Sequence, residues 1–347
     1  MPLFNGGILS EVMRETLAER KVSPESVHHV VSSLVQTSLR GVDSHGINLF
    51  PHYCRAVVAG RVNGNPRMTI DKTGESAAVV DADHAFGHHA GMVAMDLAIE
   101  LGKKSGVGAV SVRNSTHFGA AAYFGLRAPE KDCLGFAFTN ADALVKAFGA
   151  KQAFFGTNPI CFTAPMEGEG PYCLDMATSL VSWNRIKNHR REKERIPAHW
   201  AFDEEGNGVT DPDRARTLNP VGEYKGFGLG MMIDILCGAL AGGPMNGDIL
   251  PMFTPPPNPV KRRLSHFFVA VDISRFIDPS AFKKIVQSVA DRIRVLPPLD
   301  ADRPVMVSGD PEKKSYGARV VSGIPVHESI SEEFFSLSPG FRKAILP

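Results

Sequence analysis

The stretch that decides the fold is the apolar run and polar cluster Val110-Ser111-Val112-Arg113-Asn114-Ser115-Thr116-His117-Phe118-Gly119. Two further apolar runs end in the same way, one in Thr139-Asn140-Ala141-Asp142 and the other in Gly156-Thr157-Asn158-Pro159. Short runs of this kind are typical of buried strands, and polar residues at strand ends often carry the chemistry of an α/β protein. We therefore expect a mixed α/β sheet whose strand ends bring a histidine, a carboxylate and two amides together.

The remaining patterns favour a central sheet and a separate helical part. Strands are expected at residues 77–80, 107–112, 133–139, 160–164, 172–176 and 264–272. Helices are expected at residues 9–20, 24–40, 87–104, 120–130, 228–240, 280–296, 315–321 and 329–335, and from the cluster at 175–179 through 185. Residues 201–220, 252–259 and 305–312 are expected to be loops. We predict a helical amino-terminal lobe at residues 1–75, packed with helices of residues 275–347, and a central sheet domain at 76–274.

Composition excludes several classes of protein. The 347 residues carry a net charge of +1, so no bulk electrostatic attraction to nucleic acid or a membrane surface is expected. The five cysteines form no Cys-x-x-Cys pair, which is typical of buried thiols in a reducing compartment. The amino terminus does not resemble a signal peptide, and the most apolar long segment, residues 226–243, contains Asp234. We expect a cytoplasmic protein without a membrane span.

Two histidines are candidates for proton transfer. His117 follows the strand expected at 107–112, and ligands of open α/β sheets bind beyond strand ends. His45, in Ser44-His45-Gly46, follows the end of a helix, where a loop can expose an imidazole. The plainer alternative for His45 is a histidine that caps a helix through backbone hydrogen bonds. Asp142 could orient or stabilise a charged histidine, although most loop aspartates are turn or cap residues.

A second histidine group raises the question of a metal. His84, His88 and His89 lie close together, and histidines four apart on a helix can share an ion. No carboxylate or further histidine completes a ligand set nearby, so we expect surface histidines and no metal site.

Evidence for a dinucleotide site is weak from the residues alone. The glycines around Gly228 do not form the Gly-x-Gly-x-x-Gly fingerprint of a Rossmann domain. Lys225, ahead of the helix at 228–240, could pair with a phosphate. A helix start at Thr178-Ser179 could bind one through backbone N–H groups, although a simple helix cap is the plainer reading.

Six motifs in order nevertheless resemble one family over essentially the whole chain. They are Asp43-Ser44-His45-Gly46 with Pro51-His52-Tyr53, the 113–119 cluster, Gly156-Thr157-Asn158-Pro159, Asp175-Met176-Ala177-Thr178-Ser179, Lys225-Gly226-Phe227-Gly228-Leu229 and His266-Phe267-Phe268. They are similar to the malate/L-lactate dehydrogenase family of the second type. That family includes ureidoglycolate and sulfolactate dehydrogenases, diketogulonate reductase and piperideine-2-carboxylate reductase.

The resemblance implies a fold and an activity. It implies the family's own non-Rossmann NAD(P)-binding fold, with cofactor and active site in the central domain. It also implies a homodimer with active sites at the subunit interface, and NAD or NADP as the cofactor. The reaction would interconvert a 2-hydroxy acid and a 2-oxo acid, or a related imine.

The resemblance also implies roles for individual residues, which are assigned from the matching family motifs. The catalytic candidates are His117, His45 and Asp142. The substrate-binding candidates are Ser44, Tyr53, Asn140 and Ala141. The cofactor-contact candidates are Thr178, Ser179, Leu180, Val181, Lys225, Val307, Ser308 and Gly309. We expect His117 to transfer the proton, helped by a carboxylate that keeps it protonated, and His45 to polarise the oxygen.

One departure from the family pattern bears on the substrate. The position four residues after His45 usually holds an arginine that can bind a substrate carboxylate, and here it is Leu49. Another cation such as Arg55 or Lys146 would have to replace it, or the substrate carries no carboxylate there, or activity is weak. Two other functions therefore stay open: a catalytically impaired relative that binds a nucleotide or metabolite, and a metal-dependent enzyme built on the histidine group at 84–89.

Overall fold

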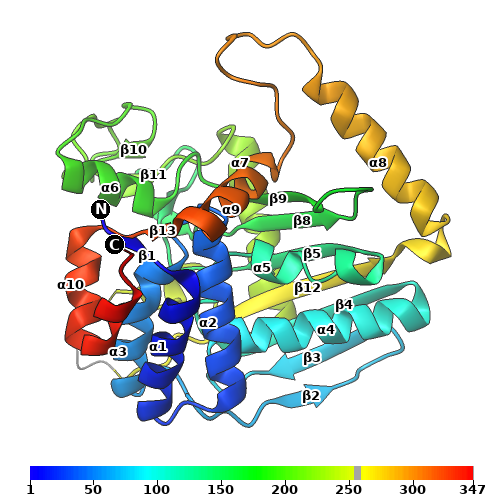
Figure 1. The fold of residues 1–347 in the computed structure, drawn as a ribbon, viewed down its shortest axis with the longest axis horizontal. Coiled ribbons are helices and arrows are strands. Elements are labelled where there is room, and N and C mark those ends of the chain that lie inside the picture. The colour runs from blue at the N-terminus through cyan, green and yellow to red at the C-terminus, as the bar shows by residue number, and fades with distance from the viewer. Residues whose placement is uncertain (254–258, 347) are drawn as a thin grey trace.

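The computed structural model describes residues 1–253 and 259–346 and has a helical part beside a seven-stranded sheet (Figure 1). The sheet has the strand order β2-β3-β4-β12-β5-β8-β9, and only β3 and β4 run parallel. Its strands are β2 (Thr69–Asp71), β3 (Ala77–Asp81), β4 (Val107–Ser115), β5 (Cys133–Thr139), β8 (Ile160–Ala164), β9 (Tyr172–Met176) and β12 (Leu264–Asp272). The loop expected at 252–259 lies largely outside the described residues.

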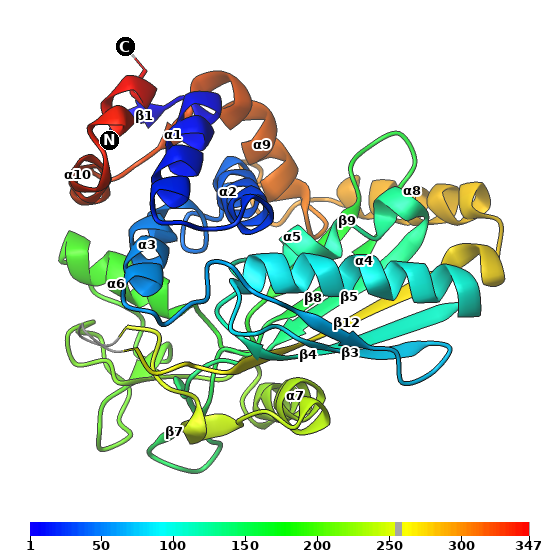
Figure 2. The ribbon, with the colours of Figure 1, turned by 90° about the horizontal axis from the view of Figure 1, so that it is seen from below.

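Alternation along β12 explains how the sheet is covered on both faces. Phe268 faces the core beneath α4 (Gly87–Ser105), whereas its neighbour Phe267 packs on the other face against a cluster that includes Ile233 of α7 (Tyr224–Asp234). Figure 2 shows α4 and α7 on opposite sides of the sheet. The helix expected at 228–240 is α7 with the π-helical turn Ile235–Ala239 that continues it.

Glycine allows α4 to lie close to the sheet. A Cβ on Gly108 of β4 would lie 2.1 Å from the Ala98 carbonyl oxygen and 2.6 Å from the Gly102 nitrogen. Only a residue without a side chain leaves room for this approach.

The helical part has its own apolar core. It contains α1 (Gly6–Glu19), α2 (Pro24–Leu39), α3 (Phe50–Val58) and α10 (Glu328–Leu337), with the final 3₁₀ turns Pro339–Ala344. Ser23 accepts a hydrogen bond from the Ser26 nitrogen, and the helix start predicted there is confirmed. Strands β1 (Leu3–Phe4) and β13 (Ile324–Pro325) pair antiparallel. Phe4 also forms a β-bridge with Ile345, so the two ends of the chain lie close together in Figure 1.

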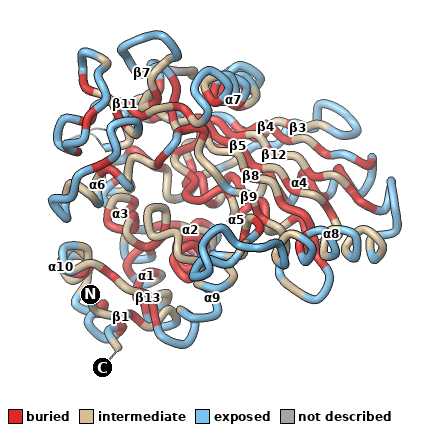
Figure 3. Tube along the Cα trace, turned by 90° about the horizontal axis from the view of Figure 1, so that it is seen from above, coloured by how far each residue is buried: buried red, intermediate tan, exposed pale blue. Residues whose placement is uncertain are grey.

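Smaller elements surround the end of the sheet that faces the helical part. A four-stranded sheet has the order β10-β11-β6-β7, formed by Ala201–Phe202, Thr217–Leu218, Val145–Lys146 and Ala153–Phe155. Helix α6 (Trp183–Glu192) packs with it, while α8 (Pro279–Arg294) lies on the far right in Figure 1 and α9 (Asp310–Ser322) lies between them, next to α2. Much of α8 and the segment after it is exposed (Figure 3).

Several sequence predictions need correction. The helix expected at 120–130 is only α5 (Ala122–Gly125) followed by the 3₁₀ turn Pro129–Lys131, because Pro129 cannot donate to a continuing helix. No helix starts at Thr178-Ser179: α6 begins at Trp183, and Ser182 caps it. The loop expected at 305–312 ends early because α9 begins at Asp310, and residues 201–220 contain the short strands β10 and β11.

Candidate active site

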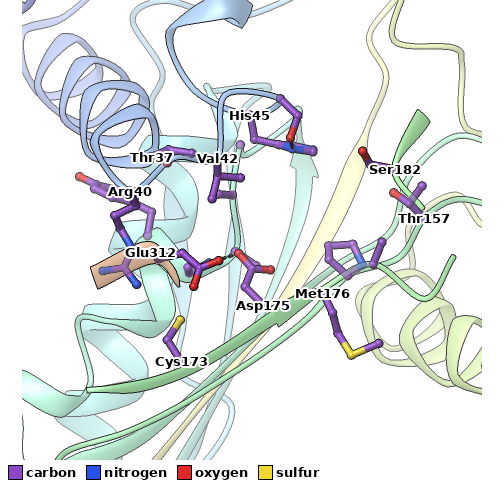
Figure 4. A pocket seen from close by; sticks show the side chains of 18 of the residues that line it. Thr37, Arg40, Val42, His45, Thr157, Cys173, Asp175, Met176, Ser182 and Glu312 are labelled. Carbon is purple, nitrogen blue, oxygen red and sulfur yellow. Dashed lines mark hydrogen bonds between the residues drawn. The ribbon is translucent and has the colours of Figure 1, made fainter. Parts of the chain in front are cut away.

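A cavity of about 1250 Å³ lies where the helical part faces the sheet. Its wall includes the end of α2, the loop after it, β9, the start of α6 and the segment that leads into α9. In Figure 4, His45 lies at one end of the labelled side chains, and Arg40, Asp175 and Glu312 lie together at the other. Most ligand pockets have volumes of roughly 300–1,000 Å³, so this cavity has room for a dinucleotide beside a small substrate.

His45 and His117 meet in this cavity although 72 positions separate them in the chain. Their rings are stacked, with centroids 5.8 Å apart and planes inclined by 18°. The loop of His45 is tied to α2, since Ser38 Oγ accepts a hydrogen bond from the Ile47 nitrogen at 2.9 Å. A Cβ on Gly46 would lie 2.0 Å from the same oxygen, so glycine is required for this turn.

Hydrogen bonds orient both rings. The Tyr53 hydroxyl lies 2.6 Å from His117 Nδ1, and the Gly119 backbone nitrogen donates to the same atom at 3.3 Å. Because a backbone N–H can only donate, neutral His117 carries its hydrogen on Nε2. The Ser44 hydroxyl lies 2.9 Å from His45 Nδ1 and can donate or accept there. Nε2 of each ring is therefore the atom left for a ligand.

Burial keeps both imidazoles neutral near pH 7. It lowers the pKa of His45 to about 4. Burial, with further contributions from neighbouring His45 and the Arg262 guanidinium, lowers the pKa of His117 well below its ordinary value. Tyr53 stays a neutral hydroxyl, because burial raises the pKa of its phenol far above the usual range.

Asp142 lines the cavity, but its charge is already partnered. Its carboxylate pairs with the Arg262 guanidinium and accepts a hydrogen bond from the Met252 nitrogen at 3.3 Å. Arg262 is 6% exposed and also donates to the Leu250 carbonyl. These contacts leave the Asp142 carboxylate engaged with Arg262, so it does not hold His117 in the protonated form. The sequence analysis missed Arg262, which no local pattern distinguishes from a surface arginine.

The substrate-binding candidates separate into two groups. Ser44 and Ala141 line the cavity, whereas Tyr53 lies behind His117 and is 1% exposed. Asn140 is buried, where its amide donates to Asp234 and to the Pro244 carbonyl and accepts from the Ser265 nitrogen. Asn140 thus connects β5, α7 and β12, the elements that frame the site.

Three of the cofactor-contact candidates line the cavity. Val307, Ser308 and Gly309 form the turn before α9, and Gly309 has a φ of +99°, which favours glycine. The Asp310 carboxylate accepts from the Val307 nitrogen at 3.0 Å and is held by Arg294 of α8 at 2.6 Å. This contact fixes the turn from outside the cavity.

The other five cofactor-contact candidates are not among the residues that line the cavity. Thr178 and Ser179 are buried, and their hydroxyls bond to the Thr157 and Val181 carbonyls. Val181 is buried as well. Leu180 is 37% exposed, and the Lys225 amine lies 6.0 Å from the centre of the Tyr224 ring. This single chain does not bring these residues to the histidine pair.

Neither of the two cations expected to replace the missing arginine at Leu49 lines the cavity, but another one does. Leu49 lines the cavity, but Arg55 bonds to Glu333 at 2.8 Å, Lys146 lies over the Phe202 ring, and neither residue lines it. Lys187 of α6 does line the cavity. It opens the basic run at residues 187–195, a pattern that predicts a solvated face, but the Lys187 side chain is partly buried.

The histidine group at 84–89 does not form a metal site in the part of the chain described. No cluster of three or more possible ligands occurs among residues 1–253 and 259–346. The expectation of surface histidines is wrong for His88, which is fully buried with its ring 4.8 Å from that of Tyr53. Burial lowers the pKa of His88 to about 3.

The described residues therefore define an α/β enzyme with a paired-histidine site and no Rossmann fingerprint. The chain matches the sequence profile of the malate/L-lactate dehydrogenase family over residues 7–334. It is 33% identical over 319 residues to a malate dehydrogenase of Pyrococcus abyssi, covering 89% of this chain and 86% of that protein. It is 31% identical over 330 residues to an L-sulfolactate dehydrogenase of Methanothermobacter thermautotrophicus, covering 94% of each chain.

Solved structures agree with the sequence comparisons. The crystal structure of a malate dehydrogenase from Entamoeba histolytica superposes with a TM-score of 0.91 at 28% identity, covering 99% of this chain and 98% of the other. The chain belongs to the malate/L-lactate dehydrogenase family. The predictions of this family, of a mixed α/β fold, and of a dehydrogenase that uses NAD or NADP are confirmed.

Proposed function

We propose that this enzyme interconverts a 2-hydroxy acid and a 2-oxo acid, using His45 and His117 for the proton step. The observation that carries the proposal is the stacked histidine pair, oriented through Nδ1 and open at Nε2 in a cavity that fits a dinucleotide. Bound nicotinamide supplies the hydride chemistry, and the protein supplies orientation and a proton.

The hydrogen bonds favour a division of labour opposite to the one expected from the sequence. Neutral His117 carries its hydrogen on Nε2, so it can donate a hydrogen bond to the substrate oxygen but cannot accept a proton there. His45 has no backbone donor on Nδ1, so its Nε2 can hold the lone pair. His45 is therefore the base that takes the hydroxyl proton in the oxidation and returns it in the reduction.

The cofactor site is proposed around the Val307-Ser308-Gly309 turn. The turn lines the same cavity as the histidines, and Arg294 and Asp310 hold it in place. The candidates at Thr178–Val181 and Lys225 stay predictions. Lys225 lies on α7, which is also proposed below to contact a second copy of the chain.

We further propose a homodimer. Five apolar side chains on α7 and the helical turns after it are between 37% and 58% exposed: Leu229, Met231, Met232, Ile235 and Leu240. Several exposed apolar side chains on one helix next to the active-site elements are typical of a subunit interface. The proposed partner is a second copy of this chain, and sedimentation analysis of the purified protein tests whether it dimerises. A monomer at micromolar concentration would contradict this part of the proposal.

A cytoplasmic location and the division into lobes are part of the same proposal. All five cysteines are free and buried, as suits a reducing compartment. No helix in the described part of the chain is long and apolar enough to cross a membrane. The separate apolar cores of the helical part and the sheet support lobes at 1–75 and 76–274, with α10 on the first.

A spectrophotometric screen tests the function. Purified protein is mixed with NADH or NADPH and a panel of 2-oxo acids, cyclic imines and uncharged ketones, with His45→Ala and His117→Ala as controls. We expect wild type to oxidise the reduced cofactor with at least one 2-oxo acid and both variants to lose most activity. Absence of any nicotinamide binding would overturn the proposal.

One observation favours a second candidate function, that of a catalytically impaired relative that binds a nucleotide or metabolite. Leu49 in the cavity wall removes the arginine fork usual in this family. That alternative predicts cofactor binding without turnover across the whole panel.

A further inference from the structure

Three permanent cations line the cavity, and their partners differ. Arg127 is held by Asp96 at 2.8 Å and by Glu130 at 2.7 Å. Arg40 lies at the end of the cavity that contains Asp175 and Glu312 (Figure 4). Lys187 makes no hydrogen bond or ion pair with any residue of the described chain, so its charge is available to a ligand.

Helix α6 places Lys187 at the histidine end of the cavity. One turn earlier on the same face, the Asn184 amide donates to the Ser44 carbonyl at 2.8 Å. This contact joins the first turn of α6 to the loop that carries His45. Lys187 therefore extends along the wall that Leu49 and Asp142 also line.

The surroundings of the Lys187 amine suit an anion. Its nitrogen lies 3.8 Å from the centre of the Phe253 ring, which shields one side from water. Burial and then Arg190 lower the pKa of this amine, which shows that its charge is incompletely compensated. Asp142 opposes the shift, but its carboxylate is engaged by Arg262.

We propose that Lys187 binds the carboxylate of the 2-oxo or 2-hydroxy acid, at the wall where Leu49 offers only an apolar surface. This inference rests on the proposed function and names the residue that selects acidic substrates. An ammonium group is a point charge and lacks the planar fork of an arginine. The site therefore selects for negative charge more than for the orientation of the carboxylate plane.

The test compares the removal of a charge at a partly buried position of α6 with its removal at an exposed position of the same helix. Lys187→Met removes the amine in the cavity, Lys187→Arg keeps the charge, and Arg191→Met removes an exposed charge from the same helix. Each is assayed with a 2-oxo monocarboxylate and with its uncharged methyl ester. Binding of oxalate to the NADH-loaded protein is measured by calorimetry, because it does not require turnover.

Lys187→Met is expected to lower kcat/KM for the acid by about 10- to 100-fold, the range that a hydrogen bond to a charged group supplies. It should weaken oxalate binding similarly and leave the ester within about twofold. Lys187→Arg should recover most of the loss, and Arg191→Met should match wild type.

Two results would overturn the assignment: unchanged activity and oxalate affinity in Lys187→Met, or equal losses with acid and ester. Failure of the proposed function is distinguishable, because wild type would then turn over no substrate while oxalate binding still compares the variants.

Discussion

Replacing Tyr53 by phenylalanine isolates the hydroxyl that orients His117. Tyr53 is 1% exposed, so the change removes one oxygen from a packed site and leaves the ring in place. The lost contact is the 2.6 Å bond to His117 Nδ1, while the longer bond from the Gly119 nitrogen remains. A buried hydrogen bond of this kind contributes about 0.5–1.5 kcal/mol, so we expect kcat/KM to fall about 3- to 10-fold.

The pH profile distinguishes positioning from a loss of packing. A hydroxyl that donates to Nδ1 stabilises the neutral ring and so lowers the pKa of His117. Its removal should raise that pKa. Because a charged His117 would oppose proton transfer to the stacked His45 ring, the acid limb of the oxidation profile should move to higher pH. The cofactor KM should not change.

Steady-state oxidation of the best 2-hydroxy acid between pH 5 and 9 provides the assay, with Tyr316→Phe on exposed α9 as the matched control. If Tyr53→Phe keeps kcat/KM within twofold of wild type and has the same acid limb, the hydroxyl does not position His117.

Three further predictions concern the cofactor turn, the sheet and acid stability. Arg294→Met should raise the cofactor KM about fivefold and leave the KM of the 2-oxo acid unchanged, because about 1 kcal/mol of support for the turn before α9 is lost; equal rises in both would contradict this. Gly108→Ala should lower the free energy of unfolding by about 3 kcal/mol in urea titrations, since its Cβ would lie 2.1 Å from a carbonyl of α4, whereas Gly317→Ala, which meets nothing, should not. His88 and His266 are fully buried, and burial lowers the pKa of each to about 3. The unfolded chain binds protons at these sites below about pH 6.5 and the native chain does not, so unfolding free energy should fall by about 2–3 kcal/mol per pH unit below pH 6; a flat profile from pH 7 to 5 would refute this.

Local sequence patterns predicted the strands well. The expected bounds are those of β5, β8, β9 and β12 in the structure. Buried strands have short apolar runs flanked by turn residues, which can be recognised in the sequence. The family motifs placed His45 and His117 in one cavity, which no local pattern could do across 72 positions.

Residues whose role depends on tertiary packing were harder to predict. Lys187 sits in a run of basic residues, and only the docking of α6 on the Ser44 loop turns it toward the cavity. Arg262 follows a proline-rich segment and gives no sign that it will be buried beside Asp142. Tyr53 looked like a substrate contact, yet the packing of α3 places it behind His117.

The place of β12 in the sheet has a consequence for biosynthesis. β12 pairs with β4 on one side and β5 on the other, although it is the last strand of this sheet to leave the ribosome. Until residue 272 has been made, the nascent chain can form at most two half-sheets, β2-β3-β4 and β5-β8-β9, and each has an unpaired inner edge. Such edges readily pair with those of other chains, so the half-made protein is the form most exposed to aggregation. Insertion of β12 gives both inner edges a partner and joins the two halves into one sheet.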